Sequence, residues 1–351
     1  MIVKNLNSIR KLIEEEIKPV IGCTEPASIA FAFSVARRNL KYGLSKDFSA
    51  LVYLSKDVYR NASTVFVPGV RKIGIEFAVA SGILTSYDKF NPFKENVKKL
   101  KDISELASKS NWLKIVKLNK RGIFVRAVLK TEKENVSVFI KDKHNYVKSI
   151  TRNGKLIFKN TVKKLYHIRS LKEIFEIVNL KDKKLEETVK HFMLEQSKNI
   201  ERKFKSGIMA VYRLIEERML GSSKEIITIT GSGNQGIFLF VPYYFLYKKY
   251  KDRILPALLF SILTQIYLAE RKERISSLCG LANKSAPSLI SGLAYFSGKD
   301  LEDIIKMMNL TEETLRGLKC EGAKRSCALK GYISLLTVKR ILSEFKCYEK
   351  V

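Results

Sequence analysis

Residues 225–240, EIITITGSGNQGIFLF, place a glycine-rich turn directly after a run of β-branched residues. The spacing G-x-G-x-x-G is typical of a turn that binds a dinucleotide between a strand and a helix. A dinucleotide-binding unit also requires a βαβ module and an acidic residue about 20 positions further on. Here a long helical pattern precedes the turn, Pro242 falls where the crossover helix would run, and Asp252 lies in a charged segment. An NAD-dependent oxidoreductase is therefore the weaker interpretation.

A different ligand suits the same turn. Gly231, Gly233 and Gly236 can form a nest of backbone N–H groups, which binds anions such as a substrate carboxylate. Three neighbouring side chains would add hydrogen-bond donors, and we expect them to bind substrate: Ser232, Asn234 and Gln235.

The composition indicates a folded protein with a large positive charge. The chain has 351 residues, of which 46% are hydrophobic and 10% aromatic, so more than one domain is expected. Lysine and arginine number 65 against 35 aspartate and glutamate, a formal net charge of +30. Such a charge favours nucleic acids, anionic membranes or small anionic ligands. Because the basic residues are scattered and no RGG, zinc-knuckle or Lys/Arg-run motif occurs, a basic nucleic-acid-binding protein is a weaker alternative.

The sequence gives no sign of export or of a membrane span. Its beginning, MIVKNLNSIRKLIEEE, lacks the apolar region of a signal peptide. The most apolar stretch, 236–269, is divided by Pro242, Pro256 and the charged KKYKDR, so neither half reaches the ~18 residues that a span needs. We expect buried core helices, a cytoplasmic protein and no membrane partner. Five cysteines, an odd number, argue against a disulfide framework.

Hydrophobic periodicity in the first part of the chain predicts mainly helices. We expect helices over 8–19, over 26–40 with Thr24 as N-cap, and over 72–84. A strand is expected over 48–55.

From about residue 90 the pattern changes. A charged helix over 91–109 is followed by short alternating runs with turn signals such as Arg152-Asn153-Gly154, which predict a small antiparallel sheet. The runs cover 113–118, 123–130, 136–142, 145–150 and 155–159.

Helical patterns return from 170 to 220, and the last predicted helix covers 326–346. The fold class is therefore α+β, with a helix-rich catalytic core built from both chain ends. In this interpretation residues 1–89 and 166–351 form the core, and residues 90–165 form an inserted small α+β domain that carries the antiparallel sheet.

The histidines offer no metal site. His144, His167 and His191 lie in separate predicted elements and form no pair with metal-ligand spacing. The sequence also lacks H-E-x-x-H, Walker A and G-x-S-x-G motifs. We interpret these histidines as surface or turn residues.

Three cysteines lie beside glycines in the last third of the chain. Cys320 and Cys327 flank a glycine in LKCEGAKRSCALKG, and Cys279 precedes one in ISSLCGLA. They could converge on one iron–sulfur cluster, since cysteine thiolates hold such clusters. The spacing matches neither common ferredoxin pattern, so buried structural cysteines are the alternative.

The two other cysteines differ from each other. In GCTEPAS, Cys23 stands at the start of a predicted helix, where exposed N–H groups and the macrodipole lower a thiol pKa and favour a reactive thiolate. A buried cysteine in a turn is the alternative for this position. Cys347 lies on a polar tail without a clear role.

Four motifs occur in a characteristic order: IKPVIGCTEPASIAFA, ITGSGNQGI followed by a proline, RISSLCGLA and CEGAKRSCALK. Together they resemble the L-cysteine desulfidase family, which is related to the iron–sulfur L-serine dehydratases. The resemblance spans nearly the whole chain. It includes VSVFIKDKHNYVKSITRNGKLIF, which is similar to the family's strand–His–strand–Asn-Gly hairpin.

The resemblance implies α,β-elimination of L-cysteine to sulfide and an aminoacrylate, which hydrolyses to pyruvate and ammonia. It also implies one [4Fe–4S] cluster per subunit, held by Cys279, Cys320 and Cys327, with one open iron as a Lewis acid. Cys23 would be the base that removes the α-proton. An anaerobic setting would suit such a cluster.

The resemblance also implies a substrate-binding set around these groups. Besides the side chains of the glycine turn, it comprises Thr24, Glu25, Asn61 and Lys324. We expect a small amino acid as the partner and no nucleic acid despite the charge of +30; the sequence leaves open whether the protein is a homo-oligomer.

Two segments depart from the family pattern, and these departures bear on the identity of the substrate. RNASTVFVPGVRKIG keeps Asn61, Pro68 and Gly69 but lacks intervening glycines. After Cys279 the family favours small residues, whereas this chain introduces Lys284 and Pro287. L-Serine, or another β-substituted amino acid, is therefore the alternative substrate.

Overall fold

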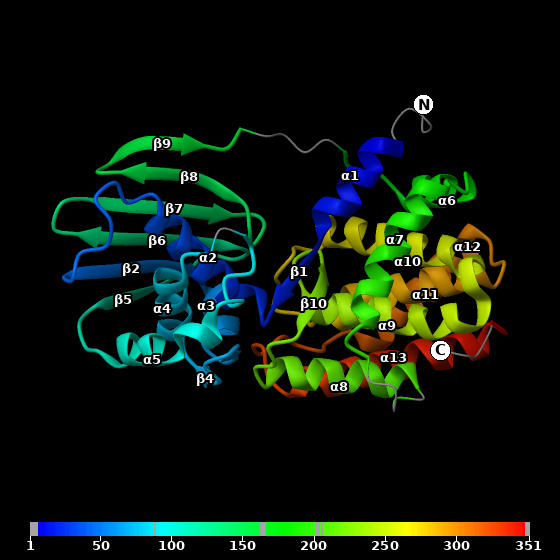
Figure 1. Cartoon of the computed structure of the whole chain (residues 1–351). Helices are drawn as coiled ribbons and strands as arrows, with labels where there is room; N and C mark the ends of the chain where they lie inside the picture. The colour runs from blue at the N-terminus through cyan, green and yellow to red at the C-terminus, as the bar shows by residue number, and fades with distance from the viewer. Residues whose placement is uncertain (1–5, 88, 162–165, 201–203, 205, 348–351) are drawn as a thin grey trace.

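The computed structural model describes residues 6–87, 89–161, 166–200, 204 and 206–347. Figure 1 shows two regions side by side, one built around a sheet and one built from packed helices. The sheet region has a core of buried residues that runs mainly from Val20 to Ile150. The helical region has a core drawn mainly from residues 9–17 and 168–347. The protein is therefore α+β, as the sequence predicts.

The sheet region contains a six-stranded mixed sheet with the order β5-β2-β6-β7-β8-β9. Its strands are β2 (Phe48–Ser55), β5 (Leu113–Leu118), β6 (Phe124–Thr131), β7 (Asn135–Lys141), β8 (Val147–Arg152) and β9 (Lys155–Lys159). β2 runs parallel to β5, and the other neighbours are antiparallel. Asn153 and Gly154 join β8 to β9 with φ values of 49° and 78°. Positive φ at both positions is what a two-residue hairpin turn requires, so the predicted hairpin is confirmed.

The sheet region also contains elements that precede residue 90, where the sequence analysis placed the boundary of the inserted domain. The strand over 48–55 pairs with both β5 and β6, so it belongs to the sheet rather than to a helical core. The helices α2 (Thr24–Arg38) and α4 (Ile75–Thr85) pack against each other, and α2 also contacts β6 and β7. The change of pattern near residue 90 therefore marks a change from buried helices to half-buried strands within one region. The division of the chain into domains at residues 90 and 165 stays a prediction.

The first predicted helix is also shorter than expected. α1 (Leu6–Glu16) ends at Glu16, and Ile17–Ile21 form strand β1, which pairs antiparallel with β10 (Glu225–Ile229). Pro19 disfavours a helix interior because it lacks an N–H group, and its β-branched neighbours favour an extended chain. β1 then leads directly to the segment that contains Cys23.

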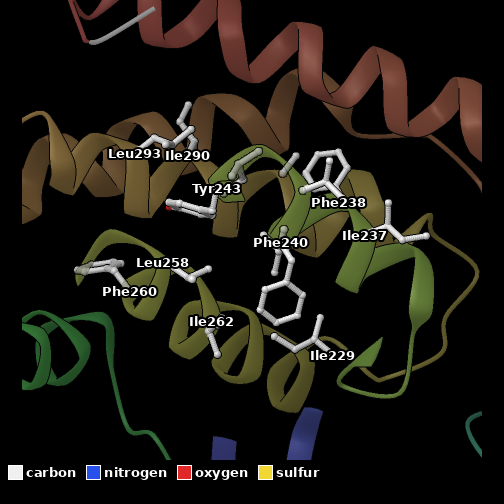
Figure 2. Packing of buried hydrophobic residues seen from close by; sticks show 14 of the residues in the cluster. Ile229, Ile237, Phe238, Phe240, Tyr243, Leu258, Phe260, Ile262, Ile290 and Leu293 are labelled. Carbon is white, nitrogen blue, oxygen red and sulfur yellow. The ribbon is translucent and has the colours of Figure 1, made fainter. Parts of the chain in front are cut away.

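The helical region is built from long apolar helices. Figure 2 shows part of its core, where labelled side chains from three helices lie together with Ile229 of β10. The hydroxyl of the fully buried Tyr243 donates to the carbonyl of Ala257 at 3.0 Å, so this polar group is satisfied inside the core. The helices are α6 (Leu171–Asn179), α7 (Lys183–Ser197), α8 (Gly207–Met219), α9 (Gly233–Tyr250), α10 (Leu255–Arg271), α11 (Ala286–Phe296), α12 (Leu301–Leu315) and α13 (Ser326–Glu344).

Shorter elements connect these parts. They are α3 (Lys56–Ala62), α5 (Leu100–Ser108), β3 (Phe66–Val67), β4 (Lys72–Ile73), the 3₁₀-helices Asn96–Lys99 and Lys251–Ile254, and a π-helix over Leu281–Ser285. In the described part of the chain, one helical segment, 233–271, is long and apolar enough to cross a membrane. Because 78% of its apolar window is buried inside the protein, it has the character of a core element.

Candidate active site

A pocket lined by both regions brings together most of the predicted site residues. Its free volume is about 100 Å³. Pockets for drug-sized ligands measure roughly 300–1,000 Å³, so this pocket suits a small molecule rather than a dinucleotide. The predicted residues that line it are Cys23, Thr24, Glu25, Asn61, Ser232, Asn234, Gln235, Cys279, Cys320 and Cys327.

Cys23 and Glu25 form a close pair at the start of α2. The Cys23 thiol donates to Oε2 of Glu25 at 2.8 Å, and the Thr24 hydroxyl reaches the same oxygen at 3.1 Å. Cys23 is itself the N-cap residue, and Thr24 is the first helical residue, so the predicted cap lies one residue too late. The pair is enclosed, because only 4% of Cys23 is exposed.

The environment of Cys23 acts against the ionisation that the sequence suggested. Burial raises the pKa of the Cys23 thiol well above its usual value, and the neighbouring Glu25 carboxylate raises it further. The positive charge of Arg218 opposes both effects without cancelling them. The expectation of a lowered thiol pKa was therefore wrong for this resting site. A helix N-terminus is a weaker influence than burial beside a carboxylate.

Glu25 is a buried carboxylate that several donors surround. Asn61 Nδ2 donates to its Oε1 at 2.8 Å, and Nε2 of His144 lies 3.7 Å from the same oxygen. Burial alone would raise the pKa of Glu25, but His144, Cys23 and Asn61 more than offset this, so the pKa lies well below its usual range. Glu25 is thus ionised and positioned to accept a proton.

His144 is a site residue that the sequence analysis missed. It lies between β7 and β8, is only 4% exposed and lines the pocket. Neither ring nitrogen has a hydrogen-bond partner within the described residues, while its carbonyl accepts from Ser28 Oγ at 2.7 Å. His144 lies in a turn, as the sequence predicted, but it is buried rather than on the surface. His167 and His191 are exposed, as expected. His144 belongs to the segment that resembles the family's hairpin, and this resemblance was the signal that could have identified it as a site residue.

The loop that carries His144 is fixed by ion pairs next to the site. Lys143 Nζ lies 2.9 Å from Oε1 of the buried Glu16. Arg274, which lines the pocket, donates to both oxygens of Glu16 at 2.6 and 2.8 Å. Glu16 therefore connects the sheet region to the segment that precedes Cys279.

The glycines of the turn have different structural roles. Gly231, with φ of 81°, lines the pocket, and a Cβ added there would lie 2.6 Å from Nδ1 of His144. Gly236 lies instead against the backbone of Ile227 in β10, where no side chain would fit. Gly236 also donates its N–H to the Ser232 carbonyl within α9. Gly236 therefore does not contribute to the predicted nest, and a nest at Gly231 and Gly233 stays a prediction.

The turn does stand between a strand and a helix, β10 and α9. However, β10 pairs only with β1 among the described residues, and that pairing is antiparallel. The parallel βαβ context of a dinucleotide-binding unit is therefore missing around this turn. The NAD-dependent alternative receives no support from this geometry.

The three glycine-flanked cysteines all line the pocket. The backbone N–H of Cys279 donates to the carbonyl of Leu318 at 2.7 Å, and that of Cys320 donates to Ser277 at 2.7 Å, so two short segments run side by side. Cys327 lies in the first turn of α13. All three thiols are free, and Oδ1 of Asn61 lies 3.9 Å from Cys320 Sγ.

This donor set fits an iron–sulfur cluster. Within the described residues, no three His, Cys, Asp or Glu side chains stand close enough together to hold a single metal ion. A cluster makes a different demand, because its thiolates bind separate irons and so stand further apart. The three free thiols that line this pocket are donors of the kind that such a cluster requires.

Two further side chains lie away from the pocket: Lys324, which was predicted to bind substrate, and Cys347, to which the sequence assigned no role. Lys324 is exposed and does not line it, because the backbone around Gly322 and Ala323 faces the pocket instead. Cys347 is only 6% exposed and packs in the core of the helical region.

Besides Arg274, two cationic side chains of the pocket were not predicted. Arg218 donates to Oδ1 of Asn234 at 2.8 Å and to the carbonyl of Gly22 at 2.8 Å. Lys284 is 1% exposed and donates to the carbonyl of Glu273 at 2.7 Å; its burial lowers the pKa to about 8. Neither residue belongs to a motif with a recognisable spacing, so only the folded chain brings them to the site.

Comparisons with known proteins find relatives over almost the whole chain. Residues 87–338, more than half of the chain, match the serine dehydratase alpha chain family. A UPF0597 protein of Thermosipho africanus is 30% identical, over 94% of this chain and 87% of that protein. A UPF0597 protein of Clostridium perfringens is 31% identical, over 91% of this chain and 83% of that protein. The chain therefore belongs to the serine dehydratase alpha chain family.

Proposed function

We propose that this protein is an iron–sulfur-dependent lyase that catalyses the α,β-elimination of L-cysteine to sulfide, ammonia and pyruvate. One observation carries the proposal: the Cys23 thiol meets Glu25 at 2.8 Å in a pocket that three other free cysteines line. The family match supports a lyase that acts on serine or a chemically similar amino acid.

Cys279, Cys320 and Cys327 would hold one [4Fe–4S] cluster per subunit, with one iron open. When bound, such a cluster supplies a Lewis acid that favours loss of the substrate's β-thiolate. Asn61 connects Glu25 with these cysteines, because its amide nitrogen donates to Glu25 while its oxygen lies 3.9 Å from Cys320 Sγ.

In this proposal Cys23 is the base that takes the α-proton. Its own proton at Sγ is directed to Oε2 of Glu25, so Glu25 can accept it. The transfer is uphill in the resting site, because the pKa of Cys23 is raised and that of Glu25 is lowered. The same difference makes the Cys23 thiolate a strong base once it forms. Arg218 lowers the cost of forming it through its positive charge.

The remaining pocket side chains would orient the amino acid. Thr24, Ser232 and Gln235 line the pocket with polar groups that a zwitterionic substrate can contact. The small free volume, about 100 Å³, favours a substrate of the size of cysteine or serine. We further propose a cytoplasmic protein without a nucleic-acid or membrane partner, and a homo-oligomer is compatible with this site.

L-Serine is the second candidate substrate, because the matching family is described by serine dehydration. The same base and the same cluster would serve either leaving group. Anaerobic purification with cluster reconstitution, followed by iron analysis and assays of sulfide and pyruvate, tests both. We expect about four irons per chain and faster turnover of L-cysteine. Faster turnover of L-serine would favour the alternative, and a reconstituted protein without iron or product would contradict both.

A further inference from the structure

Arg218 is a buried cation at the end of α8. It is 3% exposed and lines the pocket. Two of its nitrogens donate to uncharged oxygens, Oδ1 of Asn234 and the carbonyl of Gly22, each at 2.8 Å. Its third nitrogen, Nε, is buried without a partner among the described residues. The guanidinium group is therefore held in place but not neutralised.

Two other charged side chains of the pocket, Arg274 and Glu25, are better compensated than Arg218. Lys284 also donates only to carbonyls, but burial lowers its pKa to about 8, whereas an arginine keeps its charge. Arg274 donates twice to the carboxylate of Glu16. Glu25 accepts hydrogen bonds from Cys23, Thr24 and Asn61. No carboxylate of the described chain lies at ion-pair distance from Arg218. Since a buried charge without a counter-ion is costly, a complementary anion is expected from outside the chain.

The environment of Arg218 is suited to an anion for a second reason. Its guanidinium lies against Gly233, the first residue of α9, where an added Cβ would be only 2.6 Å from Nε. The first backbone N–H groups of a helix have no partner within the helix and carry a partial positive charge. The glycine therefore allows the side-chain cation and the N-terminus of the 18-residue helix α9 to stand together.

We infer that Arg218 and the N-terminus of α9 bind the α-carboxylate of the amino-acid substrate, an inference that rests on the proposed function. A carboxylate has two oxygens and one negative charge, which suits both an arginine and a helix N-terminus. The site would thereby select free α-amino acids over their esters, amides and decarboxylated amines. Arg218 is then a specificity-determining residue, and Gly233 is the glycine that makes room for it.

The test measures binding to the cluster-free protein, so that it does not depend on turnover. Isothermal titration would compare L-serine with L-serine methyl ester, and L-cysteine with its methyl ester. We expect the wild-type protein to prefer each acid by at least about tenfold, and Arg218→Met to lose this preference. An unchanged preference in Arg218→Met, or no preference in the wild-type protein, would overturn the inference.

Two further variants keep the test independent of folding defects. Gly233→Ala retains the arginine but displaces its guanidinium, so the acid preference should fall here as well. Arg213→Met makes the same chemical change earlier on α8, outside the pocket, and should leave the preference unchanged. If Arg218→Met does not fold, a Gly233→Ala protein that keeps its preference contradicts the inference. Absence of sulfide and pyruvate from the cluster-loaded wild-type protein would instead contradict the proposed function.

Discussion

The thiol of Cys23 lies 2.8 Å from Oε2 of Glu25, within the first turn of α2. The two groups differ strongly in acidity, because burial raises the pKa of Cys23 while the donors around Glu25 lower the pKa of Glu25. The resting state therefore holds its proton on sulfur. Any chemistry at Cys23 must begin by moving that proton, and Glu25 is the acceptor in contact.

Glu25→Gln tests this relationship. The change removes the negative charge that helps to raise the pKa of Cys23, so the thiol pKa should fall. Activity should nevertheless fall by at least ~100-fold, because the proton acceptor is lost. Thiolate absorbance of the cluster-free protein against pH, with Cys23→Ala as the reference, measures the first effect. A Glu25→Gln enzyme with wild-type kcat would remove Glu25 from the proton transfer.

His144→Leu tests whether His144 supports catalysis. Its Nε2 lies at ion-pair distance from Oε1 of Glu25 and helps to lower the pKa of that buried carboxylate, so the replacement should reduce the free energy of unfolding by about 1–3 kcal/mol. The ring lies 3.7 Å from Glu25 and lines the pocket, so kcat/KM should fall by roughly tenfold or more. Thermal melts and steady-state assays check the two effects. The exposed His167→Leu is the control, and equal activity of both variants would make His144 structural.

Glu16→Gln tests the ion pairs behind the His144 loop. Burial alone would raise the pKa of Glu16, but Arg274 and Lys143 lower it from 4.5 to about 2. Glu16 therefore stabilises the fold above the unfolded pKa of 4.5, and this contribution is lost as the pH falls towards 2. Breaking such a buried pair should reduce the free energy of unfolding near neutral pH by about 3–5 kcal/mol. The variant should also lose this part of the acid dependence.

Urea unfolding near pH 7 and near pH 3 measures both effects of Glu16→Gln. Glu14→Gln is the matched control on α1, because the side chain of Glu14 is 49% exposed and forms an ion pair only with Arg10 among the described residues. That control should change stability by less than about 0.5 kcal/mol. A Glu16→Gln protein as stable as the wild type near pH 7 would show that the network adds nothing.

Single serine variants test the proposed cluster ligands. Each of Cys279→Ser, Cys320→Ser and Cys327→Ser should lose iron and activity after anaerobic reconstitution, because a hydroxyl is a poor ligand for iron compared with a thiolate. Cys347→Ser should keep both, since Cys347 packs in the helical core away from the pocket. Iron analysis and the visible spectrum give the result. Full iron content in Cys320→Ser would remove Cys320 from the ligand set.

Much of the site could be predicted from short motifs. The segments around Cys23, Ser232, Cys279 and Cys320 do meet in one pocket, although they are far apart in sequence. Local chemistry also predicted the hairpin at Asn153 and Gly154, because Asn-Gly is favoured in two-residue turns that need positive φ at both positions. Such features depend on neighbouring residues in the chain, which a sequence displays directly.

Other features depend on tertiary contacts that no local pattern records. The turn that carries His144 packs against a distant part of the chain, where the hydroxyl of Ser28, 116 residues away, donates to the His144 carbonyl. Cys23 is a weak acid because its pocket closes around it, although its place at a helix start suggested the reverse. Ile17 continued the helical period of Ile9 and Ile13, but it begins the strand that pairs with β10. In each case a distant partner decided the outcome.

The central claim is that Cys23 removes the α-proton, and exchange of that proton with solvent tests it most directly. In deuterated water, the cluster-loaded wild-type enzyme should introduce deuterium at the α-carbon of bound L-cysteine, which mass spectrometry of recovered substrate detects. Cys23→Ala should keep its iron and still bind L-cysteine, yet show no exchange and turn over at least ~100-fold more slowly. A Cys23→Ala enzyme that exchanges the α-proton and remains active would contradict the account.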